Sequence, residues 1–405
     1  NNLVGSGIVR YSTSTPDTDD ALNATSNWWG SANGPNADAN TYNNASQGGY
    51  VSGSVEFTPW LDNSTDNGGT EFAPVTNGSD DGFPSIQAAV DSTDDTANTI
   101  QVKNGTYEES VEIRTPNITL ESAAGTTNTK IEYDGEDKIP TVDIIASDVT
   151  VDGFTIERVG GNQFSQGVAV RATDGVQVSN NEITQSGDAS QPVQGILVTD
   201  NNGDRSVTTD TVIGGNEISG FDHGIAISTQ NTTSGGISGA FIDDNTIQNN
   251  VIGIKISDFY DTDEEISATV TGNEISNNED GIRVLDDDTG PAGTEPEGSA
   301  NLDGFVVERN NIVDNTNSGI THEASADDNS VDASLNWWGN ASGPNADSTN
   351  DVEGDGTPGE GLVVQDPFLT TPIENIEVDD VGDTKKFAQD VIAPAGQDVT
   401  AVGFP

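Results

Sequence analysis

A tetrad of the form Gly-[Ile/Val]-x-[Val/Ile] recurs at nearly constant spacing and limits what this chain can fold into. Five copies begin 28 or 29 residues apart, a looser copy begins at Gly319, and an Asn-x-Ile turn precedes most of them. One turn and one short strand cannot bury an apolar face alone, so such units bury it by stacking on each other. The tetrads begin at Gly167, Gly195, Gly224, Gly253 and Gly281, and the turns at Asn181, Asn216, Asn245, Asn273 and Asn310.

Further short strands are predicted upstream of these units. They are Thr99–Val102, Val111–Ile113, Ile118–Leu120, Val142–Ile145, Val149–Val151 and Phe154–Ile156, each with period-two alternation and with no helical stretch between them. Before them, residues 82–91 read as a short amphipathic helix with Ile86, Ala89 and Val90 on one face. We therefore expect an all-β fold, a parallel β-solenoid with a short N-terminal capping helix that covers its open strand edge. The Ile and Val of each tetrad should point inward, and one Asn per coil could form a ladder of amides.

A twelve-residue stretch occurs twice, which indicates tandem units. Residues 27–38 and 336–347 match at ten of twelve positions. We interpret residues 1–61 as the C-terminal coils of a preceding β-helix unit, 62–81 as a Gly/Asp-rich linker, and 82–369 as a complete β-helix unit. Residues 370–405 would begin a further β-rich domain or serve as a strand-exchange tail. Because the chain is out of phase with its own repeat, we expect it to be a piece of a longer protein.

Each copy of the repeat carries a Trp-Trp pair, Trp28-Trp29 and Trp337-Trp338. Paired indoles have a large apolar surface, so they can pack over the last coil of a solenoid and close its C-terminal end. The alternative is that all four indoles stack on sugar rings. Both copies lie at the same place relative to the end of a unit, which favours end-capping.

The charge balance is extreme, with 68 acidic and 13 basic residues and a formal net charge of −55. Such a chain repels itself in dilute salt, but at molar salt the Debye length falls to about 3 Å and the repulsion is screened. The composition resembles that of proteins from salt-loving archaea. Nucleic acid is excluded as a partner, because binding phosphates requires clustered Lys and Arg. No run of eighteen apolar residues predicts a membrane span, and no Cys is present for disulfides or thiolate metal sites.

A family resemblance is carried by Pro84-Ser85-Ile86-Gln87-Ala88-Ala89-Val90, Thr99-Ile100-Gln101-Val102 and Gly105-Thr106-Tyr107, together with the two repeated motifs. These residues resemble the right-handed parallel β-helix of the pectin-lyase-like superfamily, and most of all its copper-maturation (NosD-like) and haloarchaeal surface types. The resemblance implies a right-handed β-helix for residues 82–369 and for the fragment 1–61. It does not imply one function, since the superfamily contains lyases, hydrolases, epimerases, viral tailspikes and non-enzymatic surface proteins.

The candidate catalytic residues are His223, Lys255 and Arg283. In superfamily hydrolases a Gly-His-Gly element accompanies paired Asp and an Arg-x-Lys, and lyases use Ca²⁺-binding Asp with a catalytic Arg or Lys. Here Asp222-His223-Gly224 is similar to the His-Gly element, and Lys255 and Arg283 occupy the same outward position of consecutive tetrads. The paired Asp and the Arg-x-Lys are missing, so we favour the reading that the two cations pair with nearby carboxylates such as Asp258 and Asp286.

Acidic clusters supply candidate ligands for structural Ca²⁺, since carboxylates are the oxygen donors that this ion prefers. No other cofactor is expected, and solvated acidic loops are the simpler interpretation. The candidate ligands are Asp351, Glu353, Asp355, Asp286 and Asp288.

Eight Asn-x-Ser/Thr sequons are candidate glycosylation sites. A chain this rich in Asn, Ser and Thr produces such sequons by chance, so their number is not evidence that they are used. They begin at Asn23, Asn44, Asn63, Asn77, Asn104, Asn117, Asn231 and Asn340.

We therefore expect a non-enzymatic, extracellular structural or adhesive protein of a halophilic archaeon, displayed on the cell surface or assembled into a fibre. Such a protein would associate with other copies of itself, end to end or by exchange of a strand from the tail. Surface polysaccharide would be a further partner. The alternative is a polysaccharide lyase, hydrolase or epimerase that uses His223, Lys255 and Arg283 on an acidic polysaccharide. A carbohydrate-binding β-helix or viral spike without catalysis shares the same fold.

Overall fold

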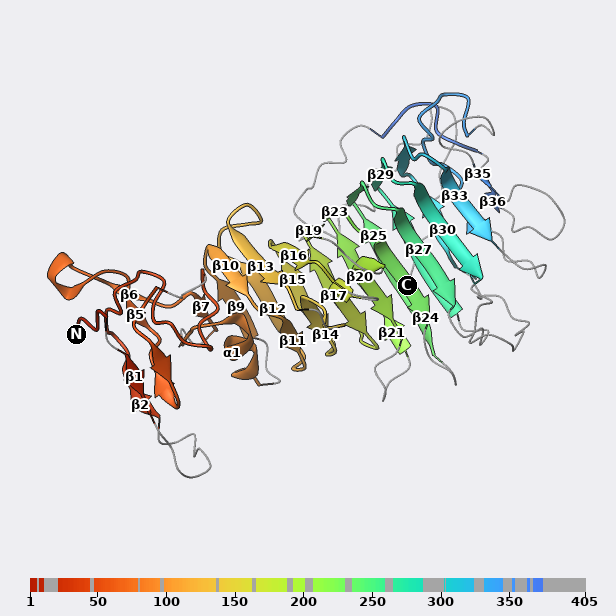
Figure 1. Cartoon of the computed structure of the whole chain (residues 1–405). Coiled ribbons are helices and arrows are strands. Elements are labelled where there is room, and N and C mark those ends of the chain that lie inside the picture. Colours follow the sequence, from red (N-terminus) through yellow and green to blue (C-terminus); the bar gives the residue numbers. More distant parts are fainter. Residues whose placement is uncertain are drawn as a thin grey trace, which may run out of the picture.

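The computed structural model describes residues 1–5, 7–10, 21–43, 47–78, 81–94, 98–135, 138–161, 165–187, 192–200, 207–229, 235–258, 265–286, 302, 304–323, 331–344, 352–353, 363–364 and 367–373. Three long sheets lie around a common interior, and successive strands go to the first, second and third sheet in turn (Figure 1). Within these stacks each strand pairs in parallel with the equivalent strand of the next coil. The fold is a right-handed parallel β-helix, as predicted.

Among the described residues, the first sheet has thirteen strands, the second eight and the third nine. The stack of the first sheet consists of β9 (Asn98–Val102), β12 (Ile118–Ser122), β15 (Thr150–Asp152), β18 (Gln177–Ser179), β22 (Val212–Gly214), β25 (Gly236–Asp243), β28 (Glu265–Thr271), β31 (Val306–Glu308), β34 (Val331–Asp332) and β36 (Val363–Val364). Strand β21 (Val207–Thr209) pairs with β25, and β7 (Val75–Thr76) and β8 (Gly82–Phe83) lie at the end of the stack next to β9. The second sheet contains β10 (Gly105–Glu108), β13 (Thr129–Tyr133), β16 (Thr155–Val159), β19 (Glu182–Ser186), β23 (Glu217–Ser219), β26 (Thr246–Gln248), β29 (Glu274–Ser276) and β32 (Asn311–Val313). The third sheet contains β11 (Val111–Ile113), β14 (Val142–Ile144), β17 (Ser165–Arg171), β20 (Val193–Thr199), β24 (His223–Thr229), β27 (Ile252–Asp258), β30 (Asp280–Asp286), β33 (Ser318–Glu323) and β35 (Val352–Glu353).

The interior is filled by columns of aliphatic side chains. In the second sheet the Ile of each Asn-x-Ile motif lies in register with the Ile of the next coil, and every Ile in this column is fully buried. Burying one such side chain contributes about 1.5–3 kcal/mol, so the repeated column supplies much of the driving force for stacking. The motif supplies Ile183, Ile218, Ile247, Ile275 and Ile312, and the column continues through Ile156 and Ile131 in coils without the motif.

Each tetrad begins with glycine because the neighbouring coil leaves no room for a side chain. A Cβ atom built on Gly253 would lie 2.5 Å from the carbonyl oxygen of Gly281, and the other tetrad glycines from Gly167 to Gly281 would meet the next glycine's carbonyl at 2.4–2.8 Å. Real Cβ atoms do not approach backbone oxygen this closely. Any other residue would therefore push successive coils of the third sheet apart.

The predicted amide ladder is present at the turns from the first to the second sheet. The side-chain nitrogen of each Asn donates to the side-chain oxygen of the Asn in the next coil at 2.9–3.1 Å. The last rung, Asn336, belongs to the repeated Asn-Trp-Trp-Gly stretch and was not predicted. The ladder runs through Asn181, Asn216, Asn245, Asn273, Asn310 and Asn336, and Asn1 and Asn27 form the equivalent pair in the first unit at 3.1 Å.

Helix α1 (Ile86–Asp91) lies at the N-terminal end of the stack, with Ile86, Ala89 and Val90 buried as expected. Its predicted start at residue 82 is wrong: residues 82–83 are strand β8, and the helix begins after Ser85, whose side chain accepts a hydrogen bond from the Ala88 N–H.

The helix covers only one of the three sheet edges at this end. The Gln87 side chain bonds to both backbone groups of Glu112, Oε1 accepting at 2.7 Å and Nε2 donating at 3.1 Å, and so covers the edge strand β11. Strand β7 pairs antiparallel with β9 and covers the first sheet. The edge of the second sheet is covered by residues 41–43 of the first unit.

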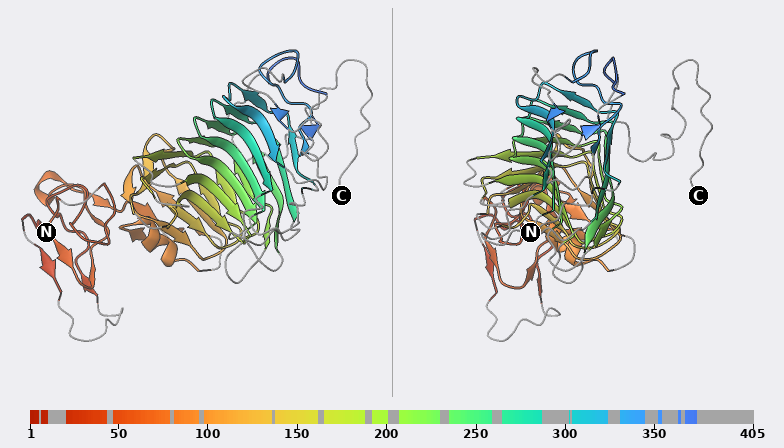
Figure 2. Two further views of the ribbon diagram at one scale, coloured as in Figure 1. Left: turned by 45° about the vertical axis from the view of Figure 1, so that its right-hand side comes forward. Right: turned by 90° about the vertical axis from the view of Figure 1, so that its right-hand side faces the viewer.

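The first unit has the same pairing as the end of the second. In the first unit β1 (Ile8–Val9) pairs with β3 (Val51–Ser52), and β2 (Leu22–Asn23) pairs with β4 (Val55–Glu56). In the second unit β33 pairs with β35 and β34 pairs with β36 in the same way. This first unit lies at the α1 end of the stack (Figure 2).

The predicted linker forms short elements that pack against the two units. Strand β5 (Trp60–Leu61) pairs antiparallel with β6 (Glu71–Phe72) across a 3-10 turn at Thr65–Asn67. One cluster of buried apolar side chains runs from Ala24 through Trp60 and Val75 to the last coils. No helix in the described ranges has the length and apolar composition needed to cross a membrane.

Candidate functional site

The three candidate catalytic residues lie on neighbouring strands of the third sheet. His223 begins β24, Lys255 is in β27 and Arg283 is in β30, and the register places Lys255 directly beside Arg283. His223 pairs with Ile252, whereas Lys255 pairs with Ala226, three positions further along the strand. The three therefore share one flank, as expected, but not one row.

His223 is held neutral near pH 7. Burial, together with the positive charges of Lys255 and Arg283, lowers the pKa of His223 to about 4. Its Nδ1 atom is buried with no hydrogen-bond partner among the described residues. An imidazole with so low a pKa is a weak base near pH 7, whereas the two cations could bind a carboxylate.

Arg283 pairs with a carboxylate that we did not predict. Its guanidinium lies 3.7 Å from Asp280, three residues earlier in the same strand, and the Ser318 hydroxyl donates to that carboxylate at 2.9 Å. The side chains of the expected partners, Asp258 and Asp286, lie outside the described residues. The general expectation that scarce cations pair with nearby acids fits Arg283.

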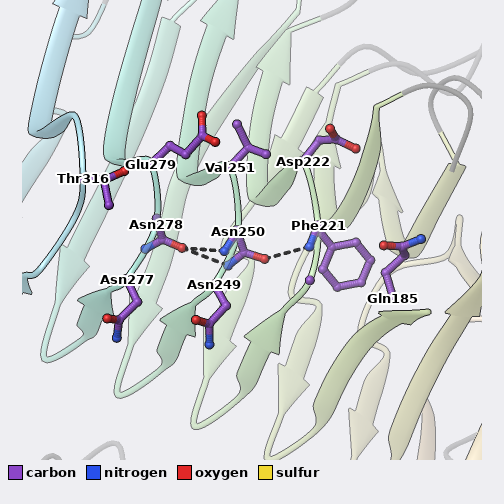
Figure 3. A pocket seen from close by; sticks show the side chains of 11 residues that line it. Gln185, Phe221, Asp222, Asn249, Asn250, Val251, Asn277, Asn278, Glu279 and Thr316 are labelled. Carbon is purple, nitrogen blue, oxygen red and sulfur yellow. Dashed lines mark hydrogen bonds between the residues drawn. The ribbon is translucent and has the colours of Figure 1, made fainter. Parts of the chain in front are cut away.

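A polar groove of about 640 Å³ lies on the turns that lead into these strands (Figure 3). Asp222, Val251 and Glu279 project from equivalent positions of three successive turns on one side of it, and Val251 is 41% exposed. The other lining residues are Gln185, Gly220, Phe221, Asn249, Asn250, Asn277, Asn278 and Thr316.

The floor of this groove is a second amide ladder, which we did not predict. Asn250 Nδ2 donates to Asn278 Oδ1 at 3.2 Å, Asn278 Nδ2 donates to Asn315 Oδ1 at 3.1 Å, and Asn250 Oδ1 accepts from the Phe221 N–H at 3.0 Å. These amides already bond to one another and to backbone carbonyls such as that of Ile218. A ligand would therefore meet only the groove's rims.

A second charged cluster lies on the outer face of the third sheet near α1. Asp143 accepts a hydrogen bond from Arg171 Nε at 2.8 Å, and Glu112, which pairs with Arg114, lies beside Asp143 in the register. Burial raises the pKa of Asp143, although Arg171 opposes the shift. No sequence motif links these residues, and only the register of β11, β14 and β17 brings them together.

The acid cluster and the cations are too far apart to act on one bond. The register runs from Asp143 through Ala169, Leu197 and Ala226 to Lys255, which is four strand spacings or about 19 Å. The two carboxyl groups of a glycosidase stand about 5–9.5 Å apart. Asp143 and Lys255 therefore cannot form one catalytic pair.

The two Trp pairs behave alike in both units. Trp29 and Trp338 are buried in the core, whereas Trp28 and Trp337 are half-buried and bridge to Asn2 and Asn311 of the preceding coil. This arrangement supports end-capping. Only Trp28 and Trp337 retain surface for a sugar, and that role stays a prediction.

The other predicted sites remain untested. The described residues contain no group of three or more metal-ligating side chains, and Asp351, Asp355, Asp288 and the side chains of Glu353 and Asp286 lie outside them. Among the sequons, Asn44 and Asn231 also lie outside the described residues. Asn23, Asn63, Asn104, Asn117 and Asn340 are exposed, and Asn77 is half-buried.

One protein family, described as "Protein of unknown function (DUF1565)", matches residues 117–290, which is the part of the stack from just before β12 to just after β30. No curated protein sequence matches the chain.

Several solved structures are similar in fold. A Geobacillus virus E2 protein (ORF18) has 16% identity and a TM-score of 0.37, covering 62% of this chain and 52% of its own. The alginate lyase from Paenibacillus sp. str. FPU-7 has 15% identity and a TM-score of 0.31, covering 70% and 95%. The mannuronan C-5 epimerase AlgE6 A-module of Azotobacter vinelandii has 16% identity and a TM-score of 0.26, covering 71% and 95%. The chain thus spans about half the length of the viral protein, and these likenesses concern the fold alone.

Proposed function

We propose that this chain is a structural shaft of tandem β-helix units, of the haloarchaeal surface type, that is displayed outside the cell and self-associates. In this proposal it is not an enzyme. Its partners are other copies of the same protein, end to end or through a strand lent by residues 370–405, and surface polysaccharide.

The observation that carries this proposal is the repetition of a complete end structure within one chain. The same pairs of parallel strands close the first unit and the second, and in each unit a buried Trp, Trp29 or Trp338, lies in the segment that connects the partners of these pairs. Repetition of closed units lengthens a molecule and adds no new interior cavity. An extended shaft that holds another group away from a surface benefits directly from such repetition.

The charge supports a brine environment. With a net charge of −55, the shaft resists association at low ionic strength, and molar salt removes that barrier. We expect the protein to unfold or swell as salt is dialysed away and to recover when salt returns.

The test is the state of the purified protein and of its native source in molar salt. We expect rods or filaments by electron microscopy, concentration-dependent association by ultracentrifugation, and peptides of this chain in a larger cell-surface polypeptide by mass spectrometry. A non-associating particle with no larger parent would contradict the proposal.

A second candidate is binding or processing of an acidic polysaccharide at His223, Lys255 and Arg283. The observation in its favour is that two of only 13 basic residues lie side by side next to a neutral imidazole and a polar groove. Opposite charge would attract a uronic-acid polymer to this flank of a molecule that otherwise repels it.

Lys255→Ala and Arg283→Ala test this candidate with uronic-acid polymers in molar salt. The matched control is Lys130→Ala, because Lys130 lies on the second sheet and pairs with Glu132 and Glu157. We expect about a tenfold loss of binding in the first two variants and none in the control if the flank is the site. Equal binding by all three variants would exclude it.

A further inference from the structure

The end cap of the first unit places a short segment along the open edge of the second unit. Residues 41–43 run antiparallel to β10, with the Asn43 N–H donating to the Thr106 carbonyl at 2.6 Å and the Glu108 N–H donating to the Thr41 carbonyl at 3.2 Å. Strand β10 is the first strand of the second sheet and pairs on its other side with β13. The added segment therefore covers an edge that would otherwise be open.

Side chains reinforce the same contact. Asn43 Oδ1 accepts from the Thr106 N–H at 2.8 Å, and the Tyr42 hydroxyl donates to the Asn104 carbonyl at 3.1 Å. The Tyr42 ring lies 5.6 Å from that of Tyr107 in the second unit. It also lies 5.3 Å from Phe72, so Tyr42 joins the two units through one aromatic cluster.

The docking segment is held in shape by its own unit. Asn40 is 6% exposed, and its side-chain nitrogen donates to the carbonyls of Asn33 and Pro35 at 3.0 and 2.8 Å. The Asn33 side chain in turn donates to the Asn43 carbonyl at 3.2 Å. A segment that is already shaped loses less conformational freedom on docking.

The second unit is adapted to receive this segment. Gly105 has φ +152°, and a Cβ atom there would lie 2.3 Å from the Tyr42 ring and 3.1 Å from Asn43 Oδ1. The position therefore requires glycine both for its backbone conformation and for the approach of Tyr42.

A buried carboxylate connects the docking segment to α1. Glu109 accepts from the Thr41 hydroxyl at 2.7 Å and from the N–H groups of Ile86 and Gln87, both at 2.9 Å. It is 9% exposed. One side chain thus joins the first end cap, the capping helix and β10.

The second end cap lacks the corresponding residues. When the two caps are aligned on the repeated stretch, Thr349, Asn350 and Asp351 occupy the positions of Asn40, Thr41 and Tyr42. The two caps share the residues that close a unit but differ in the residues that dock.

We propose that the edge of β10 is a docking site for the end cap of a preceding β-helix unit, and that residues 41–43 are the segment matched to it. The partner is a β-helix cap that presents an aromatic side chain opposite Tyr107. Through this joint the two units unfold as one body. The proposal is independent of whether the shaft is structural or acts on polysaccharide.

The test compares the full chain with Tyr42→Ser and Gly105→Ala by calorimetry and hydrogen exchange in molar salt. The unaltered chain should show one unfolding transition. Each variant should show two, and exchange of the Asn43 and Glu108 amides should become about tenfold faster or more.

Each variant has a matched control. Tyr50→Ser removes a tyrosine of the same unit that is 52% exposed. Gly125→Ala changes a glycine at φ +76° that has nothing within 4 Å of its Cβ position. Both controls should keep the single transition.

Amides inside the first unit distinguish a broken joint from a broken fold. The Ala24 and Val51 amides bond within that unit at 2.7 and 2.8 Å. They should stay protected when the joint opens. If they lose protection together with Asn43, or if Tyr42→Ser keeps a single transition with unchanged exchange, the proposal is wrong.

Discussion

The first end cap (the described part of residues 24–61) and the second (the described part of 333–369) have the same backbone pairing in different surroundings. The N–H groups of Leu61 and Leu369 donate to the carbonyls of Asn27 and Asn336 at 3.0 and 2.9 Å. The first cap, however, continues into a segment that docks on the next unit. Most residues of the repeated stretch are the same in both caps, whereas the docking residues Thr41 and Tyr42 are replaced by Asn350 and Asp351 in the second.

The largest predicted effect on stability comes from removing the buried Trp of each cap. Trp29→Ala and Trp338→Ala should each lower the free energy of unfolding by about 3–5 kcal/mol, because both side chains are in the core. Chemical unfolding in molar salt measures this loss. The half-buried Trp28 is the control, and a Trp28→Ala loss as large as that of Trp29→Ala would contradict equivalent closure.

The end of the amide ladder should show a smaller, unequal effect. Asn336→Ala removes the acceptor for both the backbone and the side-chain N–H of Asn310, at an expected cost of about 1–3 kcal/mol. Asn27→Ala should cost less, because its bond to Asn1 is only partly buried. The exposed Asn340→Ala serves as control, and equal losses at Asn336 and Asn340 would count against a structural ladder.

Two glycines test whether the caps tolerate the same change. A Cβ on Gly34 would lie 2.7 Å from the Trp60 ring, and one on Gly343 would lie 2.6 Å from the Phe368 ring. Both alanine variants should lose about 1–3 kcal/mol through crowding and positive φ. Gly68 has a similar φ of +74°, but nothing lies within 4 Å of its Cβ position. The stability lost in Gly68→Ala therefore measures the backbone strain alone, without crowding.

The smallest predicted effect is the titration of His223, which lies in the β-helix between the two caps. It serves as a reference for the comparison of the caps, because neither cap contains a histidine. The imidazole of His223 should titrate by NMR with a pKa of about 4, below the ordinary value of about 6.5. The unfolded chain thus binds this proton more readily, so the stability that neutral His223 contributes is complete above about pH 6.5 and is lost as pH falls toward 4. His223→Asn should remove that loss, and a midpoint near 6.5 would contradict the burial that causes the shift.

Much of the shaft could be predicted from the sequence because its determinants repeat. The tetrads and the Asn-x-Ile turns indicate the third sheet, the second sheet and the first ladder. The Asn-Asn pairs at 249–250 and 277–278 are the signal that would have indicated the second ladder, but they occur in few coils. Lys255 and Arg283 were placed side by side from the register alone.

The joint and the acid cluster could not be predicted, because neither repeats. Tyr42 and Tyr107 are distant in sequence and meet only through the path of residues 62–81. Asp143 and Arg171 meet because their strands are adjacent in the stack, and nothing local distinguishes them from other charged residues. The role of the cationic flank depends on a ligand, which sequence periodicity does not encode.

The first ladder also explains how such a protein can change length in evolution. Neighbouring rungs are separated by 35, 29, 28, 37 and 26 residues along the chain, yet they meet at 2.9–3.1 Å. Loops absorb insertions without altering the pitch, so a gene could gain or lose one whole turn and move everything beyond it by about 4.8 Å. The β-helix can therefore differ in length by whole coils while the backbone pairing at each end stays the same.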